Sequence, residues 1–184
     1  MSVEIPGYLA GTWAIDPVHS EVSFVVRHMM VSKVRGRFDK FEGTFVTGED
    51  PLASSVTAKV DLGSINTGQE QRDAHIRSAD FFEVEKYPEM TFVSTGIKQE
   101  EEGFILEGDL TIKDVTKTVA FQLEVSGFGP DAYGGTRCGF SATTVINRHD
   151  FHVDFNGPIP GVPGGVAVSE KVTINLEVEG VLQA

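Results

Sequence analysis

Apolar and polar residues alternate along most of this chain, as they do in strands whose two faces meet different surroundings. Residues 56–62 alternate most cleanly, and the same pattern marks segments at 11–16, 19–30, 34–46, 90–94, 104–112, 115–125, 136–147 and 172–178. Short strands with one polar face indicate an all-β sandwich or antiparallel barrel of about eight strands. Such a barrel either fills with side chains or holds one small ligand, and periodicity alone does not choose between these.

Residues 34–46 read as one strand that carries apolar side chains on both faces. Two glycines inside it, Gly36 and Gly43, predict a bend or bulge that curves the sheet toward closure. Phe38 is at an even-numbered position and Phe41 and Phe45 are at odd-numbered ones, so on a single strand they point to opposite faces. We therefore expect some of these rings to pack outside the barrel or against the helix.

Residues 66–88 interrupt the alternation and predict the one helix of the chain. Thr67 and Glu70 have the spacing of a capping box, which satisfies the free amides at a helix start. Spacings of three and four then place one stripe of residues on a common face, namely Arg72, His75, Ile76, Ala79 and Phe82. The pattern predicts a short helix over about 68–81, whose apolar end could plug or brace the strands. Residues 156–165, with three prolines and four glycines, cannot form a central strand.

Length and composition indicate a single globular domain over 1–184. Hydrophobic residues make up 40% and charged residues 23%, and no apolar run is long enough for stable membrane insertion. Residues 1–16 contain neither a basic leader nor an apolar signal core, so we expect a cytoplasmic location. A single cysteine, Cys138, excludes an internal disulfide framework.

The net charge of -12 argues against nucleic acid or an anionic membrane surface as the main partner, because both require clustered Lys and Arg. Phenylalanine dominates the aromatic residues, with 13 Phe against 3 Tyr and 1 Trp. Because Phe has no polar group that needs a partner, it can line a dry interior, although a well-filled core explains the same count.

The sequence offers weak evidence for a metal site. Of the five histidines, His149 and His152 are close in sequence, but on a strand a spacing of three places them on opposite faces. No HExxH motif and no paired cysteines occur. We therefore expect no metal ligands.

Catalytic candidates each have a simpler structural explanation. Cys138 lies among apolar neighbours on a strand, which predicts an inert buried thiol. Arg72, Asp73 and His75 could form an acid–base group, but such residues more often tie a helix to adjacent strands. His28 shares a face with Phe24, so it is either a core histidine or a polar contact for the head of an apolar ligand. We expect no catalytic residues.

A series of motifs resembles one known family. The N-terminal half carries Trp13-x-Ile15-Asp16-x-x-His19-Ser20, Phe24-x-Val26-x-His28, Gly36-Arg37-Phe38-x-x-Phe41-x-Gly43 and Ser64-Ile65-Asn66-Thr67-Gly68. Next come Arg72-Asp73-x-His75-Ile76-x-Ser78-x-Asp80-Phe81-Phe82 and Tyr87-Pro88-x-Met90-x-Phe92. The C-terminal half adds Gly108-x-Leu110-Thr111-Ile112-Lys113-x-Val115-Thr116-Lys117, Gly139-Phe140-x-Ala142 and Arg148-x-Asp150-Phe151. In order and spacing, from Trp13 to about Gly180, these resemble the YceI-like family of polyisoprenoid-binding or lipid-binding domains.

The resemblance implies a lipocalin-like fold, an extended eight-stranded antiparallel β-barrel with a helix near one end. In family members its apolar pocket holds a long-chain amphiphile such as a polyisoprenoid, an isoprenoid quinone or a fatty amide. No catalytic residues are established for the family. Many members have Gly where this chain has Asp114 and His152, and His152 adds bulk that could alter the mouth of the pocket.

From these observations we predict a non-catalytic protein that sequesters or carries a long-chain lipid or isoprenoid, with no cofactor. The expected ligand-binding residues are Phe24, Val26, His28, Phe38, Phe41, Phe45, Phe82, Phe92, Phe121, Phe140 and Arg148. Phe82 would close one mouth, and His28 or Arg148 would meet the head group. A homodimer through an exposed edge strand is compatible with the sheet. The alternatives are a metal- or histidine-dependent enzyme and a stress-response interaction module with a filled core.

Overall fold

The computed structural model describes residues 4–28, 31–156 and 168–183. Within them the strands are β1 (Gly11–Ile15), β2 (Glu21–His28), β3 (Ser32–Phe38), β4 (Phe41–Thr47), β5 (Ser55–Asp61), β6 (Ile65–Asn66), β7 (Glu89–Gln99), β8 (Phe104–Ile112), β9 (Val115–Pro130), β10 (Thr136–Asn147) and β11 (Val168–Leu182). The helices are α1 (Glu70–Arg77) and three 3-10 helices, η1 (Pro51–Ala53), η2 (Leu62–Ser64) and η3 (Arg148–Phe151). The loop expected at 156–165 lies, apart from Asn156, outside the described residues. No described helix is long and apolar enough to span a membrane.

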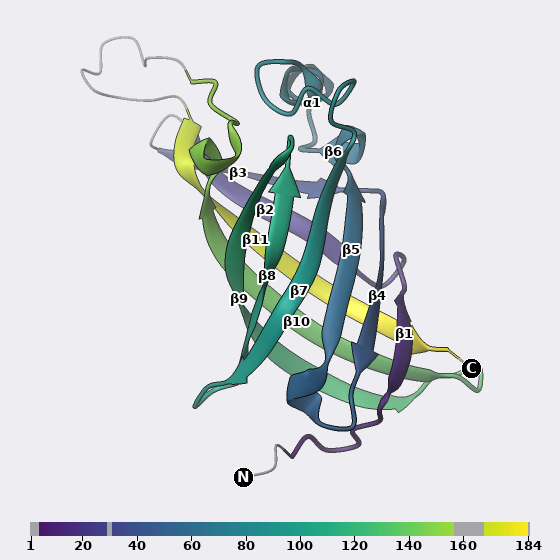
Figure 1. Ribbon diagram of the computed structural model, residues 1–184. Helices are drawn as coiled ribbons and strands as arrows, with labels where there is room; N and C mark the ends of the chain where they lie inside the picture. Colours follow the sequence, from purple (N-terminus) through teal and green to yellow (C-terminus); the bar gives the residue numbers. More distant parts are fainter. Residues whose placement is uncertain (1–3, 29–30, 157–167, 184) are drawn as a thin grey trace.

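The sheet closes because β11 has two partners on one side. Its first part pairs with β2 and its last residues pair with β1, so β1 and β2 occupy one position in the barrel wall (Figure 1). The next two positions in the wall are also shared by two strands each. First β4 pairs with β1 and β3 pairs with β2, and then β5 pairs with β4 and β6 pairs with β3. The strands therefore form a closed antiparallel barrel of eight positions, which confirms the predicted fold.

The segment at 34–46 is two strands, β3 and β4, separated by Asp39 and Lys40. The backbone at this break is held by Ser64, whose carbonyl accepts from the Asp39 N–H at 3.1 Å and whose Oγ accepts from the Lys40 N–H at 2.9 Å. The break reverses which parity faces inward, so Phe38 and Phe45 are both buried and Phe41 also faces the interior. The prediction that some of these rings pack outside the barrel is therefore wrong, whereas Phe38 does belong to the cluster against which Ile76 of α1 packs. No bulge occurs at Gly36 or Gly43.

Helix α1 spans Glu70–Arg77 and is thus shorter than the predicted 68–81. The predicted capping box is wrong, because the N-cap is Gln69 and it makes no side-chain cap bond. Thr67 instead donates through both its backbone N–H and its hydroxyl to the buried carboxylate of Asp73. Ala79 and Phe82 lie beyond the helix, in turns that return the chain to β7. At one end of the barrel, α1 lies across the opening (Figure 1).

Buried apolar side chains fill much of the barrel in three groups. Trp13, which is fully buried, packs with Phe45 and Phe140 at the end where the chain termini lie (Figure 1). A middle group contains Leu106 and Phe121. The third group lies beneath α1 and contains the largest number of aromatic and aliphatic side chains, namely Phe38, Val60, Leu62, Ile65, Phe81, Met90, Leu110, Ile112, Phe151 and Val153.

Among the described residues, four that are not glycine have the positive φ that favours glycine, namely Glu83, Lys113, Asp114 and His152. Asp114 has φ +94° in the two-residue turn between β8 and β9, and His152 has φ +60° at the end of η3. Left-handed backbone is easiest for a residue without Cβ, which accounts physically for Gly at these positions in many members of the resembled family. His152 is exposed, and it is not among the residues that line the cavity described below.

Candidate functional site: an apolar cavity beneath the helix

A mostly apolar cavity of about 300 Å³ lies between α1 and the upper barrel wall. Strands β2, β3, β10 and β11 contribute one side, and α1, the segment after it and η3 contribute the other. Most lining side chains are Val, Ile, Met or Phe. The polar exceptions are Ser23, Arg27, His28, Arg72, His75 and Arg148. We call this space the upper cavity.

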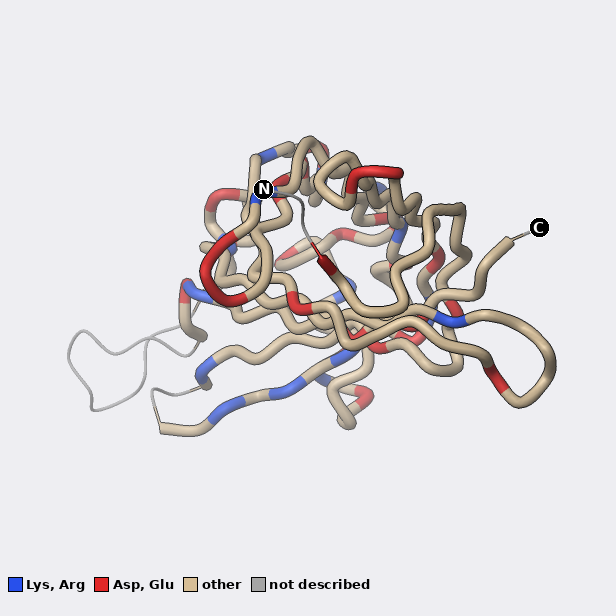
Figure 2. Tube along the Cα trace, turned by 90° about the horizontal axis from the view of Figure 1, so that it is seen from below, with Lys and Arg blue, Asp and Glu red and all other residues tan. Residues whose placement is uncertain are grey.

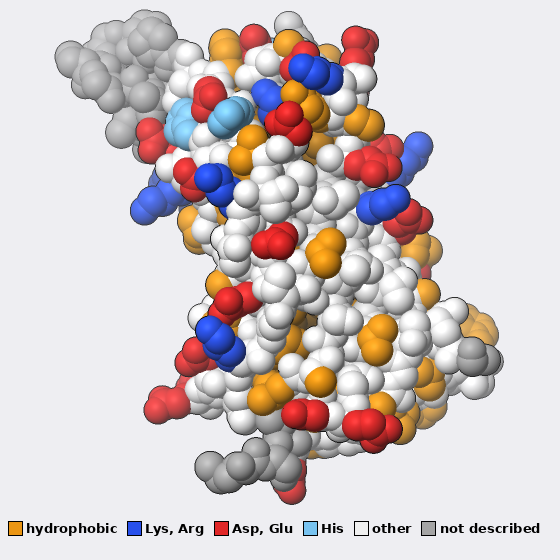
Figure 3. Space-filling view, in the orientation of Figure 1, with side chains coloured by type: hydrophobic (Ala, Val, Ile, Leu, Met, Phe, Trp, Pro, Cys, Tyr) orange, Lys and Arg blue, Asp and Glu red, His pale blue; other side chains and the backbone are white. Residues whose placement is uncertain are grey.

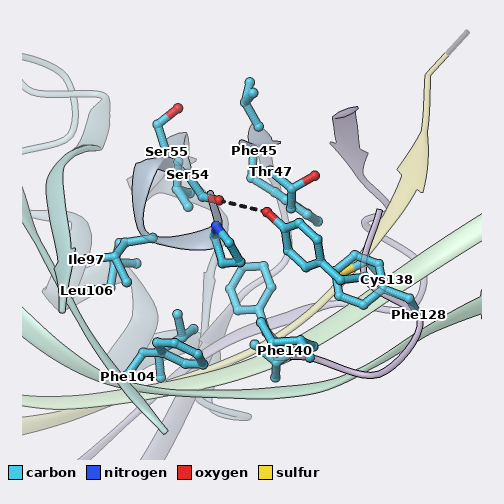
Figure 4. A pocket seen from close by; sticks show the side chains of 17 residues that line it. Phe45, Thr47, Ser54, Ser55, Ile97, Phe104, Leu106, Phe128, Cys138 and Phe140 are labelled. Carbon is cyan, nitrogen blue, oxygen red and sulfur yellow. Dashed lines mark hydrogen bonds between the residues drawn. The ribbon is translucent and has the colours of Figure 1, made fainter. Parts of the chain in front are cut away.

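Two smaller apolar cavities continue the space through the barrel. A middle cavity of about 80 Å³ shares Val22, Met90 and Ile174 with the upper cavity. A lower cavity of about 70 Å³ shares Val56, Leu106 and Phe140 with the middle one. Figure 4 shows the lower cavity, where Phe45, Phe104, Phe128 and Phe140 surround the space from different strands. Three apolar cavities thus follow one another along the barrel, with shared side chains between them, and the one beneath α1 has the largest volume of the three.

All the sequence-predicted binding residues line one of these cavities. The upper cavity is lined by Phe24, Val26, His28, Phe38, Phe82 and Arg148. The middle cavity is lined by Phe41, Phe92, Phe121 and Phe140, and the lower one by Phe45 and Phe140. The structure therefore distributes the predicted residues along the whole barrel instead of gathering them at one point.

Sequence reasoning missed the aromatic residues that close the upper cavity. Phe81, Phe151 and Phe155 line it from the turns after α1, from η3 and from the segment after η3. The ring centroids of Phe81 and Phe155 lie 5.3 Å apart, and His75 lies within 5.1 Å of both. Phe81 and Phe155 stand on irregular backbone and Phe151 ends a single short 3-10 helix, so no period marks an inward face. The only available signal was the clustering of Phe beside the predicted helix and loop.

Arg148 is buried, and its guanidinium bonds to backbone carbonyls. It donates to Val153 at 2.6 Å, to Ser169 at 2.9 Å and to Val168 at 3.3 Å, so all three of its nitrogens are engaged. Desolvation by burial lowers the pKa of Arg148 from its ordinary value, and guanidinium groups stay charged in proteins at neutral pH. Its described bonds fix η3 against β11, and its positive charge is held beside the apolar cavity.

The remaining polar groups around the upper cavity come from α1 and the β2–β3 hairpin. Arg72 is tied to Thr67, donating from Nε to the hydroxyl and from a terminal nitrogen to the carbonyl, both at 2.8 Å. His75 contacts Asp80 at 2.8 Å, and both are exposed. His28 is exposed at the end of β2. The polar groups therefore gather toward the helix end of the cavity, while its continuation through the barrel is apolar.

The candidate catalytic residues Arg72, Asp73 and His75 do not bond to one another. Arg72 and Asp73 both bond to Thr67, whereas His75 bonds to Asp80, so the three do not form one acid–base group. These bonds are local to the two ends of α1 and none of them reaches a strand, so the predicted ties between the helix and adjacent strands are not what these residues make. Cys138 is buried, and desolvation raises the pKa of its thiol to about 12, which keeps it protonated at neutral pH.

Among the described residues, one group of side chains has the spacing of metal ligands. An arginine guanidinium already lies within hydrogen-bond distance of two of them. Asp16, His19 and Glu179 bring their ligand atoms within 4.8 Å of one another. The Arg137 guanidinium donates to Asp16 at 2.6 Å and to Glu179 at 3.4 Å, which supplies the positive charge there. Hydrogen bonds from His19 and Arg137 hold the pKa of Asp16 well below its usual range. His149 and His152 lie on and beside η3 rather than on a strand, so the expectation of opposite strand faces was wrong.

An antiparallel barrel closed around an apolar cavity defines a lipocalin-like barrel protein. The family model described as the YceI-like domain matches residues 13–180, and the chain belongs to this family. The UPF0312 protein of Pseudomonas putida strain W619 is 38% identical over 179 residues, covering 95% of this chain and 88% of that protein.

Two solved structures share the fold. BcnA of Burkholderia cenocepacia has a TM-score of 0.77 at 24% identity, with 90% of this chain and 98% of that chain covered. A polyisoprenoid binding domain from Saccharophagus degradans, implicated in plant cell wall breakdown, has a TM-score of 0.70 at 17% identity, with 95% and 100% covered. At these identities the two structures support the fold alone.

Proposed function

We propose that this protein binds a long-chain amphiphile in the barrel and sequesters or carries it without chemical conversion. The ligand class is a polyisoprenoid, an isoprenoid quinone or a fatty amide or acid. The observation that carries the proposal is the upper cavity of about 300 Å³, with its apolar continuation along the barrel. Membership of the YceI-like family and the polyisoprenoid-binding structural neighbour support it.

The physical basis of such binding is the removal of methylene groups from water. Each buried methylene contributes about 0.8 kcal/mol, so a tail in the upper cavity gains affinity without many polar contacts. The head group would lie toward α1, where His28, Arg72 and His75 line the cavity. A tail longer than the upper cavity would pass Met90, which borders both upper and middle cavities and whose flexible side chain can adapt.

A paired substitution on β2 tests this proposal. Phe24 lines the upper cavity, whereas Val25, the next residue, has the opposite parity and lies opposite Arg35. We expect Phe24→Asp to abolish uptake of a fluorescent long-chain fatty acid while the protein stays folded, because a charge in the cavity opposes an apolar tail. Val25→Asp should retain uptake. Global unfolding of Phe24→Asp, or equal uptake by both variants, would contradict a ligand cavity at this position.

The histidine-dependent enzyme is the less favoured candidate. It would need His28, His75 or His149 to act together or with a metal, but His75 and His149 contact separate carboxylates, Asp80 and Asp154, each at 2.8 Å. The filled-core interaction module is disfavoured by the upper cavity. The cytoplasmic location and the homodimer remain predictions from the sequence.

A further inference from the structure

A strip of exposed cations runs along the outer face of the β2–β3 hairpin, although the chain as a whole has a net charge of -12. It consists of Arg27 on β2 and Lys33, Arg35 and Arg37 on β3, all exposed. The three β3 residues alternate with Val34 and Gly36, so they share the outward face. Figure 2 shows Lys and Arg, in blue, recurring along the backbone of this hairpin. We call these four residues the basic strip.

The basic strip is poorly neutralised within the protein. Arg37 pairs with Asp39, but among the described residues Arg27, Lys33 and Arg35 form no ion pair. Arg27 also lies directly opposite Lys33 across the two strands. Like charges in that position destabilise a hairpin, so this arrangement costs stability unless an external anion offsets it. An unpaired basic strip on an acidic protein therefore points to an anionic partner.

Apolar side chains accompany these cations. Val31, in the turn that joins β2 to β3, is 84% exposed. Val25 lies opposite Arg35, between Arg27 and Ser23 on its own strand. A protruding apolar residue flanked by cations suits the surface of an anionic bilayer, where the cations meet the head groups and the valine enters the interface. An acidic protein surface would not require the exposed valine.

The basic strip adjoins the upper cavity. Arg27 and His28 line that cavity at the end of β2, and the inward side chains of the same hairpin, Phe24, Val26 and Val34, form part of its wall. A surface that contacts this hairpin therefore lies beside the place where a lipid would enter.

We propose that the basic strip and Val31 dock the protein reversibly on anionic lipid bilayers, with the upper cavity beside the membrane. Docking as such is independent of the cargo, whereas its role in lipid loading rests on the function proposed above. This proposal departs from the expectation drawn from net charge, because attraction depends on the charges that meet the surface, and fields decay within about a Debye length. The acidic remainder of the molecule would keep other faces away from the membrane and so orient it.

Vesicle flotation at low ionic strength tests the proposal. We expect the protein to bind vesicles of phosphatidylcholine with phosphatidylglycerol, not vesicles of phosphatidylcholine alone, and to dissociate as salt is raised. Lys33→Glu with Arg35→Glu should weaken binding about tenfold or more. The matched control is Lys59→Glu with Lys98→Glu, which changes net charge equally at exposed positions on β5 and β7 and should leave binding unchanged.

Several results would overturn the docking proposal. They are no binding to anionic vesicles at low salt, equal binding to neutral vesicles, or equal loss in both double variants. Neither pair of substitutions involves a cavity-lining residue, so the lipid content of each purified variant should match that of the parent protein. A protein that contains lipid but ignores vesicles would refute docking alone. Vesicle binding by a protein that never contains lipid would refute the carrier function alone.

Discussion

The ring of Phe24 lies over Gly36, the residue opposite it on β3. A Cβ added at Gly36 would stand 2.3 Å from the ring, so only glycine permits this position of the ring. The glycine therefore sets the shape of the upper cavity, which Phe24 lines. From the sequence it was interpreted as a bend, because spacing alone does not distinguish a glycine that curves a strand from one that accommodates a ring.

We expect Gly36→Ala to push the Phe24 ring into the upper cavity and reduce the amount of bound lipid. Stability should fall by about 1–3 kcal/mol, the usual effect of overpacking. The measurements are lipid content and urea denaturation. The matched control is Gly129→Ala on β9, where an added Cβ meets nothing within 4 Å and φ is ordinary. Unchanged lipid content in Gly36→Ala would show that the ring position does not control the cavity.

Arg137 gives stability a defined dependence on pH. It bonds to Asp16 at 2.6 Å and to Asp131 at 2.9 Å, and these hydrogen bonds help lower the pKa of both carboxyls below their ordinary value of 3.8. A lowered carboxyl pKa adds stability above the ordinary value, and this is lost as pH falls through the folded value. The contribution is therefore complete at neutral pH and disappears in acid.

We expect Arg137→Met to lower the urea midpoint at pH 7, with the difference from the parent protein shrinking below about pH 4. Arg37→Met is the control, because Arg37 pairs only with the exposed Asp39 and such pairs contribute little. A difference between Arg137→Met and the parent protein that stays constant from pH 7 to pH 3 would contradict this account of the two carboxyls.

At the scale of elements, the sequence predicted strands well and their interruptions poorly. Apolar and polar residues do alternate in 34–46 both before and after Asp39 and Lys40. Before this break the even-numbered residues face inward, and after it the odd-numbered residues do. The signal was the spacing of three between Phe38 and Phe41, which was interpreted as two faces of one strand. The break is held by Ser64, which is distant in sequence, so no local pattern shows it. The residues after α1 and η3 could not be assigned for a similar reason, since irregular backbone has no period.

Helix α1 is the element most directly placed to control entry. Its residues Arg72, His75 and Ile76 line the upper cavity, and Asp73 holds the helix start to Thr67. Asp73→Ala leaves the Thr67 amide and hydroxyl without their acceptor, at a cost of about 1–3 kcal/mol. We expect faster hydrogen exchange in α1 and faster release of bound lipid.

Asp73→Asn is the matched variant, because its amide oxygen can still accept from the Thr67 N–H. Its hydrogen exchange in α1 should stay close to that of the parent protein. If Asp73→Ala left both exchange and lipid release unchanged, the Asp73–Thr67 contact would not be what holds the helix over the cavity.

At the scale of the whole molecule, periodicity predicted an all-β protein of about eight strands, and the resemblance to the YceI-like family supplied the closed barrel. Neither could show whether the interior is filled. The predicted rings do line the interior, yet the same residues would do so in a solid core. The cavity exists because side chains from α1, η3 and the strands fail to fill the space beneath the helix, which is a property of packing rather than of any segment. The basic strip was likewise not predicted, because the net charge of the whole chain does not show where positive side chains gather.

The central claim is that the upper cavity holds a long-chain amphiphile. Mass spectrometry of an organic extract of natively purified protein, prepared from the host in which the chain occurs, tests it most directly. We expect one isoprenoid or fatty amphiphile in near-stoichiometric amount, lost from Phe24→Asp and retained in Val25→Asp. An extract from folded parent protein that contains no such molecule would contradict the carrier function and favour a protein that acts through its surface.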